Sequence, residues 1–331
     1  MKKIVALIGV FLLVGLGSAN ADMSGFTTYT AEGAGISIDA KGLQDNTEGT
    51  IRAEIPAGSS VHKAYLYSAT VGSSSQADIN VVFDGNTLSA AGNRLDVGAK
   101  DSNNWVRENR WDVTSIVQNK VGSASGTFNF TLKELGYLDG EVLVVLYNDN
   151  TKPLRTAILL DGELATGGDS FNINLTTPVN KSDPNFAADL SLGISYGYQP
   201  DGQYSEVDVN GQRLTTSAGG QDDGFGANGG LITAGGIDDT NSNPADPFQT
   251  DSGGPRYDDE LYSLISFLKD GDTIISFRTL NPSNDDNIFF TAFTTLGEAQ
   301  INVIPEPATM LLLGSGLLGL AGYGRKKFFK R

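Results

Sequence analysis

Short segments rich in Val, Ile, Phe, Tyr and Thr recur along the middle of the chain, each bounded by clusters of Gly, Asn, Asp and Ser. Residues of these types favour β-strands, and apolar and polar side chains alternate in several of the segments. Long amphipathic helical patterns are scarce. The predicted strands cover residues 50–55, 64–70, 79–83, 126–132, 141–147, 156–160, 171–175, 189–196, 205–209, 273–279 and 287–296. The pattern predicts an all-β fold of tandem β-sandwich or jelly-roll-like units.

The two halves of the chain share a hairpin pattern. Residues 81–89 and 207–215 both place Asp-Gly or Asn-Gly after apolar positions, followed by Leu and by Ser or Thr. Such dipeptides favour a tight two-residue turn between strands. A short helical or turn-like apolar segment then precedes the next strand in each half, at 111–117 and 261–268. These matches predict a duplicated unit, although any two β-domains share some turn chemistry.

The predicted organisation has four parts, with a boundary between the units near residues 150–154, where Asn, Asp and Pro interrupt the pattern. The parts are a signal peptide at 1–21, a first unit at 22–153, a second unit at 154–303 with an insertion at 219–260, and a C-terminal signal at 304–331.

Cysteine and histidine are nearly absent from the chain. It has no Cys and one His, which argues against a disulfide scaffold, a thiolate metal site, a cysteine nucleophile and a multi-histidine centre. The formal net charge is −16, and the part from 22 to 307 carries 16 Lys+Arg against 39 Asp+Glu, a net of −23. Such an acidic surface argues against nucleic acid as a partner and attracts divalent cations.

The N-terminal segment has the features of a secretory signal. Lys2 and Lys3 precede a short apolar run at 4–16, and Ala19 and Ala21 form a small-x-small cleavage site. We therefore expect passage through the Sec translocon. A permanent N-terminal anchor is the alternative, but the run is short for a membrane span.

The C-terminal segment has three parts in a fixed order. Pro305, Glu306 and Pro307 are followed by an apolar stretch at 308–323, and the stretch is followed by a basic cluster. The cluster consists of Arg325, Lys326, Lys327, Lys330 and Arg331. The positive-inside rule places this cluster on the cytoplasmic side of the inner membrane and the rest of the chain across it. The stretch predicts a short transmembrane helix that serves as a temporary anchor.

Together, these three parts resemble the PEP-CTERM sorting signal. The resemblance implies an exosortase partner, an inner-membrane cysteine protease that processes its substrates near the Pro-Glu-Pro. It also implies a Gram-negative-type bacterium that makes exopolysaccharide and biofilm matrix. The resemblance covers residues 303–331 and so concerns sorting, not the activity of the remaining chain. An ordinary tail anchor, which is not cleaved, is the alternative.

Acidic loops supply the candidate metal ligands. The insertion is rich in Gly, Asp, Asn and Pro, and oxygen-rich flexible loops are typical of calcium sites. No EF-hand or nonapeptide calcium repeat occurs, and a solvated loop in which Asp and Asn form turns is the alternative. The candidate ligands are Asp222, Asp223, Asp238, Asp239, Asp246, Asp251, Asp258 and Asp259 in the insertion, with Asp285 and Asp286 between two later strands.

The enzyme motifs are incomplete. Residues 250–255 resemble the block around the nucleophile of chymotrypsin-like proteases, but the single histidine, His62, lacks that family's setting. A pair of carboxylates for glycoside hydrolysis cannot be selected among so many acidic residues. The aromatic residues considered as sugar platforms are Trp105, Trp111, Tyr196, Tyr198, Tyr204 and Tyr257, although most such residues belong to cores or rims.

The sequence thus predicts an exported, non-enzymatic structural or adhesive protein of the cell surface or extracellular matrix, with no catalytic residues. Calcium is the one candidate cofactor. A carbohydrate-binding or carbohydrate-active protein, with extracellular polysaccharide as its partner, is the alternative.

Overall fold

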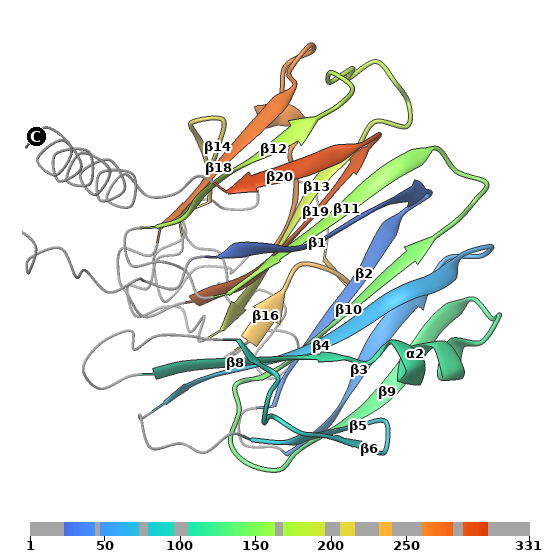
Figure 1. Cartoon of the computed structure of the whole chain (residues 1–331), viewed down its shortest axis with the longest axis vertical. Coiled ribbons are helices and arrows are strands. Elements are labelled where there is room, and N and C mark those ends of the chain that lie inside the picture. The colour runs from blue at the N-terminus through green and yellow to red at the C-terminus, as the bar shows by residue number, and fades with distance from the viewer. Residues whose placement is uncertain are drawn as a thin grey trace, which may run out of the picture. The chain divides into compact units, whose positions relative to one another are not determined.

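The computed structural model describes residues 23–43, 47–72, 79–95, 105–162, 168–195, 206–215, 232–239, 260–280 and 287–303. Nearly all regular structure in these ranges is antiparallel β-sheet, so the prediction of a β-rich fold is confirmed (Figure 1). The predicted signal peptide and C-terminal helix lie outside the described residues. Within the described ranges, no helix is long and apolar enough to cross a membrane.

The strands form four sheets, which we name A to D. Sheet A has the order β1 (Ser24–Glu32), β11 (Leu154–Asp161), β19 (Asn287–Leu296), β13 (Ala188–Ser195) and β16 (Ile232–Ala234), and β17 (Leu261–Ser263) also pairs with β13. Sheet B has the order β2 (Gly35–Gly42), β10 (Gly140–Asn148), β4 (Ser60–Gly72), β8 (Trp105–Asp112) and β7 (Arg94–Leu95).

The two outer sheets are built in the same way. Sheet C has the order β3 (Glu48–Ile55), β9 (Gly126–Glu134), β5 (Val81–Phe83) and β6 (Asn86–Leu88). Sheet D has the order β15 (Gln212–Thr215), β14 (Glu206–Val209), β18 (Ile274–Leu280), β12 (Ser170–Leu175) and β20 (Ala299–Val303). The helix α2 (Thr114–Val121) precedes β9, and the short 3-10 helix η1 (Ile265–Phe267) precedes β18.

Three hydrophobic cores place the sheets in the order C, B, A, D. The core between C and B contains Phe130 and Leu66, and it is closed at one side by Val117 of α2. The core between B and A contains Tyr67 and Phe290. The core between A and D contains Leu190, Phe171 and Phe277. The alternating side chains of each strand thus fill a core on one face or on both, as strands of stacked sheets do.

The two halves of the chain have the same strand topology. In sheet B, β2, β10, β4 and β8 are neighbours in that order, and β11, β19, β13 and β17 repeat the order in sheet A. In sheet C, β3, β9, β5 and β6 correspond in the same way to β12, β18, β14 and β15 of sheet D. The matching sequence blocks therefore occupy equivalent places, with α2 and η1 at equivalent points of the chain.

Two strands extend this repeated plan. β1 precedes the repeat and pairs with β11 of the second half, from Ser24 opposite Asp161 to Glu32 opposite Leu154. β20 follows the repeat and pairs with β12. The proposed boundary near residues 150–154 falls in the loop between β10 and β11, and the division into two domains there stays a prediction, since β1 crosses it.

The shared hairpins have the backbone that their sequences favour. Asp84 and Gly85 have φ angles of 47° and 79°, and Asn210 and Gly211 have φ angles of 51° and 72°. Two central residues in the left-handed region define the turn type that matches the twist of paired strands. The hairpins β5–β6 and β14–β15 are therefore determined by local sequence.

Replacing either turn glycine should cost the same amount of stability. We expect Gly85→Ala and Gly211→Ala each to lower the free energy of unfolding by about 1–2 kcal/mol, because a side chain disfavours a positive φ. No atom of the described structure lies within 4 Å of the added Cβ atom at either position, so the cost comes from the backbone alone. Urea unfolding measures it, with Gln212→Ala as the control; losses that differ widely between the two turns would contradict their equivalence.

Candidate functional site

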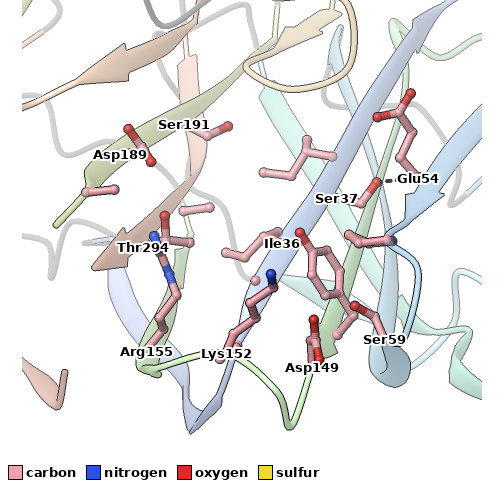
Figure 2. A pocket seen from close by; sticks show the side chains of 18 of the residues that line it. Ile36, Ser37, Glu54, Ser59, Asp149, Lys152, Arg155, Asp189, Ser191 and Thr294 are labelled. Atoms are coloured by element: carbon pink, nitrogen blue, oxygen red, sulfur yellow. Dashed lines mark hydrogen bonds between the residues drawn. The ribbon is translucent and has the colours of Figure 1, made fainter. Parts of the chain in front are cut away.

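An open groove of about 690 Å³ lies beside the edge strand β2, where residues of sheets A and B approach each other (Figure 2). Its walls come from β2, the loops after β3 and β10, the start of β11, the loop before β13, β13 itself, β19 and residues 235–237. Figure 2 shows Asp189 and Ser191 on one wall and Ser59 and Asp149 on the other. The groove is therefore bounded by both halves of the repeated plan.

The edge of β2 directs main-chain groups into the groove. The N–H of Ile237 donates to the carbonyl of Ile38 at 2.8 Å, on the side of β2 that faces away from β10. Backbone groups of alternate residues in an antiparallel strand point to the same side, so those of Ile36 also point away from β10. Gly236 permits this contact, since a Cβ atom there would overlap the carbonyl of Ile38. Residues 235–237 thus cover one end of the edge, and the groove lies at the other.

An aromatic ring lies against the backbone of β2. Tyr147 is paired with Gly35, and a Cβ atom at Gly35 would overlap the Tyr147 ring. Glycine at this position therefore lets the ring approach the backbone of the strand closely. Burial raises the pKa of Tyr147 above its usual value, so its hydroxyl stays protonated at neutral pH. The groove has an aromatic face with a neutral hydroxyl.

Several charged side chains of the groove are not engaged within the protein. Glu54, Lys152 and Arg155 form no side-chain hydrogen bond or ion pair with any residue that the structure describes. The buried Oγ of Ser59 likewise has no hydrogen-bond partner in the described part of the chain. The charged groups of Glu54, Lys152 and Arg155 are available to a ligand.

Other polar groups of the groove hold its loops. The Oδ1 atom of Asp149 accepts from the N–H of Thr151 at 2.9 Å and from its hydroxyl at 2.7 Å, and these bonds lower the pKa of Asp149. The Oγ of Ser37 accepts from the N–H of Glu54 at 2.8 Å (Figure 2). The hydroxyl of Ser191 donates to the carbonyl of Gly235. The walls are thus held by internal bonds while the free groups face the cavity.

Two of the predicted calcium ligands have other partners. Asp238 forms an ion pair with Arg52 at 2.8 Å, and a carboxylate oxygen of Asp239 accepts from the N–H of Gly236 at 2.7 Å. Within the described ranges, no group of three or more His, Cys, Asp or Glu side chains could hold a metal ion. The other candidates lie outside the described residues: Asp222, Asp223, Asp246, Asp251, Asp258, Asp259, Asp285 and Asp286. A calcium site there stays a prediction.

The single histidine and one of the two tryptophans have structural contacts. The ring of His62 stacks on Tyr29 of β1, with centroids 3.9 Å apart. Trp111 is buried in the core between sheets B and C, and its Nε1 donates to the carbonyl of Ser89 at 2.6 Å. Trp111 is therefore a core residue and not a sugar platform. The side chain of Trp105 and all of Tyr196, Tyr198, Tyr204 and Tyr257 lie outside the described part.

A family comparison identifies the C-terminal segment. Residues 303–326 match the PEP-CTERM protein-sorting motif. The chain carries this sorting motif. It implies an exported precursor that is anchored in the membrane and cleaved by an exosortase. Its predicted key residues, like the signal-peptide residues Ala19 and Ala21, lie outside the described ranges: Pro305, Glu306, Pro307, Arg325, Lys326 and Lys327.

The sorting motif covers a small part of the chain, and the remainder has only remote similarities. No curated protein matches the chain. Among solved structures, a recombinant N-glycanase F (PNGase F) is 10% identical, covers 83% of this chain and 99% of its own, and has a TM-score of 0.26. A BuGH86 variant crystallised with neoagarooctaose is 12% identical, covers 86% of this chain and 35% of its own, and has a TM-score of 0.21.

The major capsid protein P2 of bacteriophage PM2 is 11% identical, with coverage of 82% of this chain and 99% of its own and a TM-score of 0.19. Similarities at this level establish neither a common fold nor a common activity.

Proposed function

We propose that this exported protein is an adhesive component of the extracellular matrix that binds polysaccharide in the groove beside β2. The observation that carries the proposal is the set of unengaged charged groups in that groove, namely Glu54, Lys152 and Arg155, next to the ring of Tyr147. The four sheets are, in this proposal, two tandem β-sandwiches whose repeated plan forms the groove at their junction. After cleavage, the chain remains outside the inner membrane and holds matrix polymers.

The chemistry of the groove suits sugars. A pyranose ring has an apolar face that packs on aromatic rings and a rim of hydroxyls that donate and accept hydrogen bonds. Tyr147 offers the ring, Glu54 accepts hydrogen bonds, and Lys152 and Arg155 donate them. The groove is open, so a chain that continues on both sides of the bound residues is accommodated. A polymer ligand is consistent with an exported protein of a matrix.

A hydrolase is the second candidate, because Glu54 and Asp189 supply carboxylates to the same groove. Glycoside hydrolysis uses two such groups. Binding without turnover supports an adhesive protein, whereas turnover that is lost in Glu54→Gln supports the enzyme.

A glycan array probed with the full chain tests the proposal. We expect binding to at least one polysaccharide without release of reducing ends. The substitution Tyr147→Leu should weaken binding at least tenfold by removing the stacking face, and Glu54→Gln should weaken it about threefold to tenfold. Tyr137→Leu is the matched control, because Tyr137 is 49% exposed and lies outside the groove.

Two results would contradict the proposal. One is the absence of any binding on an array with neutral and acidic glycans. The other is binding that Tyr147→Leu and Glu54→Gln leave intact. Glu54 is exposed, so its variant stays folded even if Tyr147→Leu does not.

A further inference from the structure

We propose that Arg155 and Lys152 form an anion-binding end of the groove that selects sugar residues carrying a carboxylate, such as uronates. The inference rests on the proposed function, because it names the class of sugar that the groove would bind. Two observations support it: which basic side chains in the described part of the molecule form ion pairs or hydrogen bonds, and where Lys152 and Arg155 lie.

Most described basic side chains are already engaged. Ion pairs join Arg52 to Asp39 and Asp238, Lys63 to Asp112, Arg110 to Asp161, Lys120 to Asp84, Lys133 to Glu48, and Arg213 to Glu206 and Asp208. Three described basic side chains, Lys152, Arg155 and Lys269, form neither a hydrogen bond nor an ion pair. Two of these three line the same groove. In a part of the chain with a net charge of −23, two unpaired cations at one place need an explanation.

The protein holds both side chains at the groove. Arg155 is the second residue of β11 and lies between Ala31 of β1 and Leu296 of β19. Lys152 lies in the preceding loop, where its N–H donates to the carbonyl of Asp149 at 3.0 Å. The next residue, Pro153, accepts from the N–H of Gly33 at 2.8 Å. In Figure 2 both side chains point into the groove from its lower end. Both residues are therefore positioned by backbone bonds, and the charge of Lys152 also acts on Asp149, whose pKa it helps to lower.

Two acidic residues of the groove have interactions within the protein, and the nearer of them, Asp149, also interacts with the charge of Lys152. Asp149 is engaged by Thr151 through two hydrogen bonds. Asp189 lies on the opposite wall and has an interaction of its own within the protein. Glu54 lies near Tyr147 and Ser37, where it can accept from sugar hydroxyls. A carboxylate bound by Arg155 and Lys152 and hydroxyls bound by Glu54 would orient the sugar along the groove.

The preference for an acidic sugar should be large. The guanidinium group of Arg155 matches a carboxylate with two parallel hydrogen bonds, and Lys152 adds a second charge. Hydrogen bonds to charged groups contribute about 1.5–3 kcal/mol, which corresponds to roughly a 10-fold to 150-fold change in affinity. The negative surface repels a charged ligand at long range, but at 0.15 M salt such repulsion is screened beyond about 8 Å.

Isothermal titration at 0.15 M salt with tetragalacturonate and its fully methyl-esterified form tests this inference. The two ligands have the same sugar ring and differ in charge. We expect the full chain to bind the acid at least tenfold more tightly than the ester. Arg155→Gln and Lys152→Gln should each remove most of this difference, and Lys269→Gln, the third unpaired cation, should leave it unchanged.

Three results would overturn the inference. They are equal affinities for acid and ester, an acid preference that survives Arg155→Gln and Lys152→Gln together, and no binding of either ligand. If the affinities for acid and ester are equal, or if neither ligand binds, the glycan array decides separately whether the groove binds sugars at all. The array contains neutral glycans, and its comparison of the native chain with Tyr147→Leu tests the aromatic face of the groove. Failure of the anion-binding end is thereby distinguished from failure of the groove.

Discussion

Replacing Arg110 by Met is expected to lower the free energy of unfolding by about 3–5 kcal/mol, because it leaves a buried carboxylate without its cation. Arg110 of β8 in sheet B forms an ion pair with Asp161 of β11 in sheet A, and the side chain of Asp161 is 5% exposed. The hydroxyl of Tyr67 also donates to Asp161, at 3.0 Å. The guanidinium group lies 3.3 Å from the centre of the Phe26 ring. This cluster is a polar connection between the two inner sheets.

The pKa values of the cluster agree with this view. Burial raises the pKa of Asp161, whereas Arg110 and Tyr67 lower it. Burial, together with the charge of Asp161, raises the pKa of Tyr67 well above its usual value, so this hydroxyl remains a donor. Without Arg110, Asp161 would become protonated, or its unpaired buried charge would destabilise the contact between sheets A and B.

Urea unfolding of Arg110→Met measures the loss. Lys63→Met is the matched control, because Lys63 forms an exposed ion pair with Asp112 on the same sheet, and it should cost less than about 1 kcal/mol. Adding Asp161→Leu and Tyr67→Phe to Arg110→Met should recover at least half of the loss, since apolar groups replace the whole cluster. An effect of Arg110→Met as small as that of the control would show that the cluster does not hold the sheets together.

At pH 9, Glu141→Gln is expected to be more stable than the native chain by about 2–4 kcal/mol, although the two should differ by less than about 1 kcal/mol at pH 5. Glu141 is the second residue of β10 and is fully buried, and neither of its carboxylate oxygens has a hydrogen-bond partner in the described structure. Glu134, at the end of β9, is also buried, and one of its oxygens is unpartnered there. The pair lies at the end of the core between sheets B and C.

Burial is the main cause of the shifts in this pair. It raises the pKa of Glu134 to about 8, and burial with the charge of Glu134 raises the pKa of Glu141 well above its usual value. The folded state therefore binds more protons than the unfolded state at any pH above about 4.5. The stability that the protonated pair contributes is complete below that pH and is lost as the pH rises through 8. Glutamine stays neutral and does not contribute to this loss.

Unfolding by urea at pH 5, 7 and 9 measures the effect. Glu48→Gln is the control, because Glu48 is exposed and pairs with Lys133, and it should leave stability nearly unchanged at each pH. A Glu141→Gln variant that is no more stable than the native chain at pH 9 would contradict the assignment of a protonated pair.

Local features of the fold could be predicted from the sequence, whereas long-range pairing could not. The hairpin at Asn210-Gly211 was predictable because two adjacent residues determine its turn. β8 was not predicted, because its charged residues Arg107, Glu108 and Arg110 interrupt the apolar or alternating pattern that marks a strand. The pairing of Arg110 with Asp161, 51 residues further along the chain, is what allows the charge of Arg110 between the sheets. A partner so distant in sequence can be identified only once the arrangement of the strands is known.

The groove was missed for a related reason. Sequence reasoning directed attention to the acidic insertion, where candidate ligands are adjacent in the chain. The groove residues come from separate segments, and Tyr147 and Arg155 taken alone resemble ordinary strand residues. The one local signal was the break at residues 150–154, which places a loop between the two halves. That loop carries Lys152 and forms one end of the groove.

Hydrogen–deuterium exchange of the full chain, with and without the glycan that binds most tightly on the array, tests the central claim most directly. The account predicts slower exchange of backbone amides in residues 33–38 and 147–155, which line the groove from β2 and from the loop between β10 and β11. The turn at 84–86, in the hairpin β5–β6, does not line the groove and should be unaffected. Protection confined to segments outside the groove, or none at saturating glycan, would contradict the account.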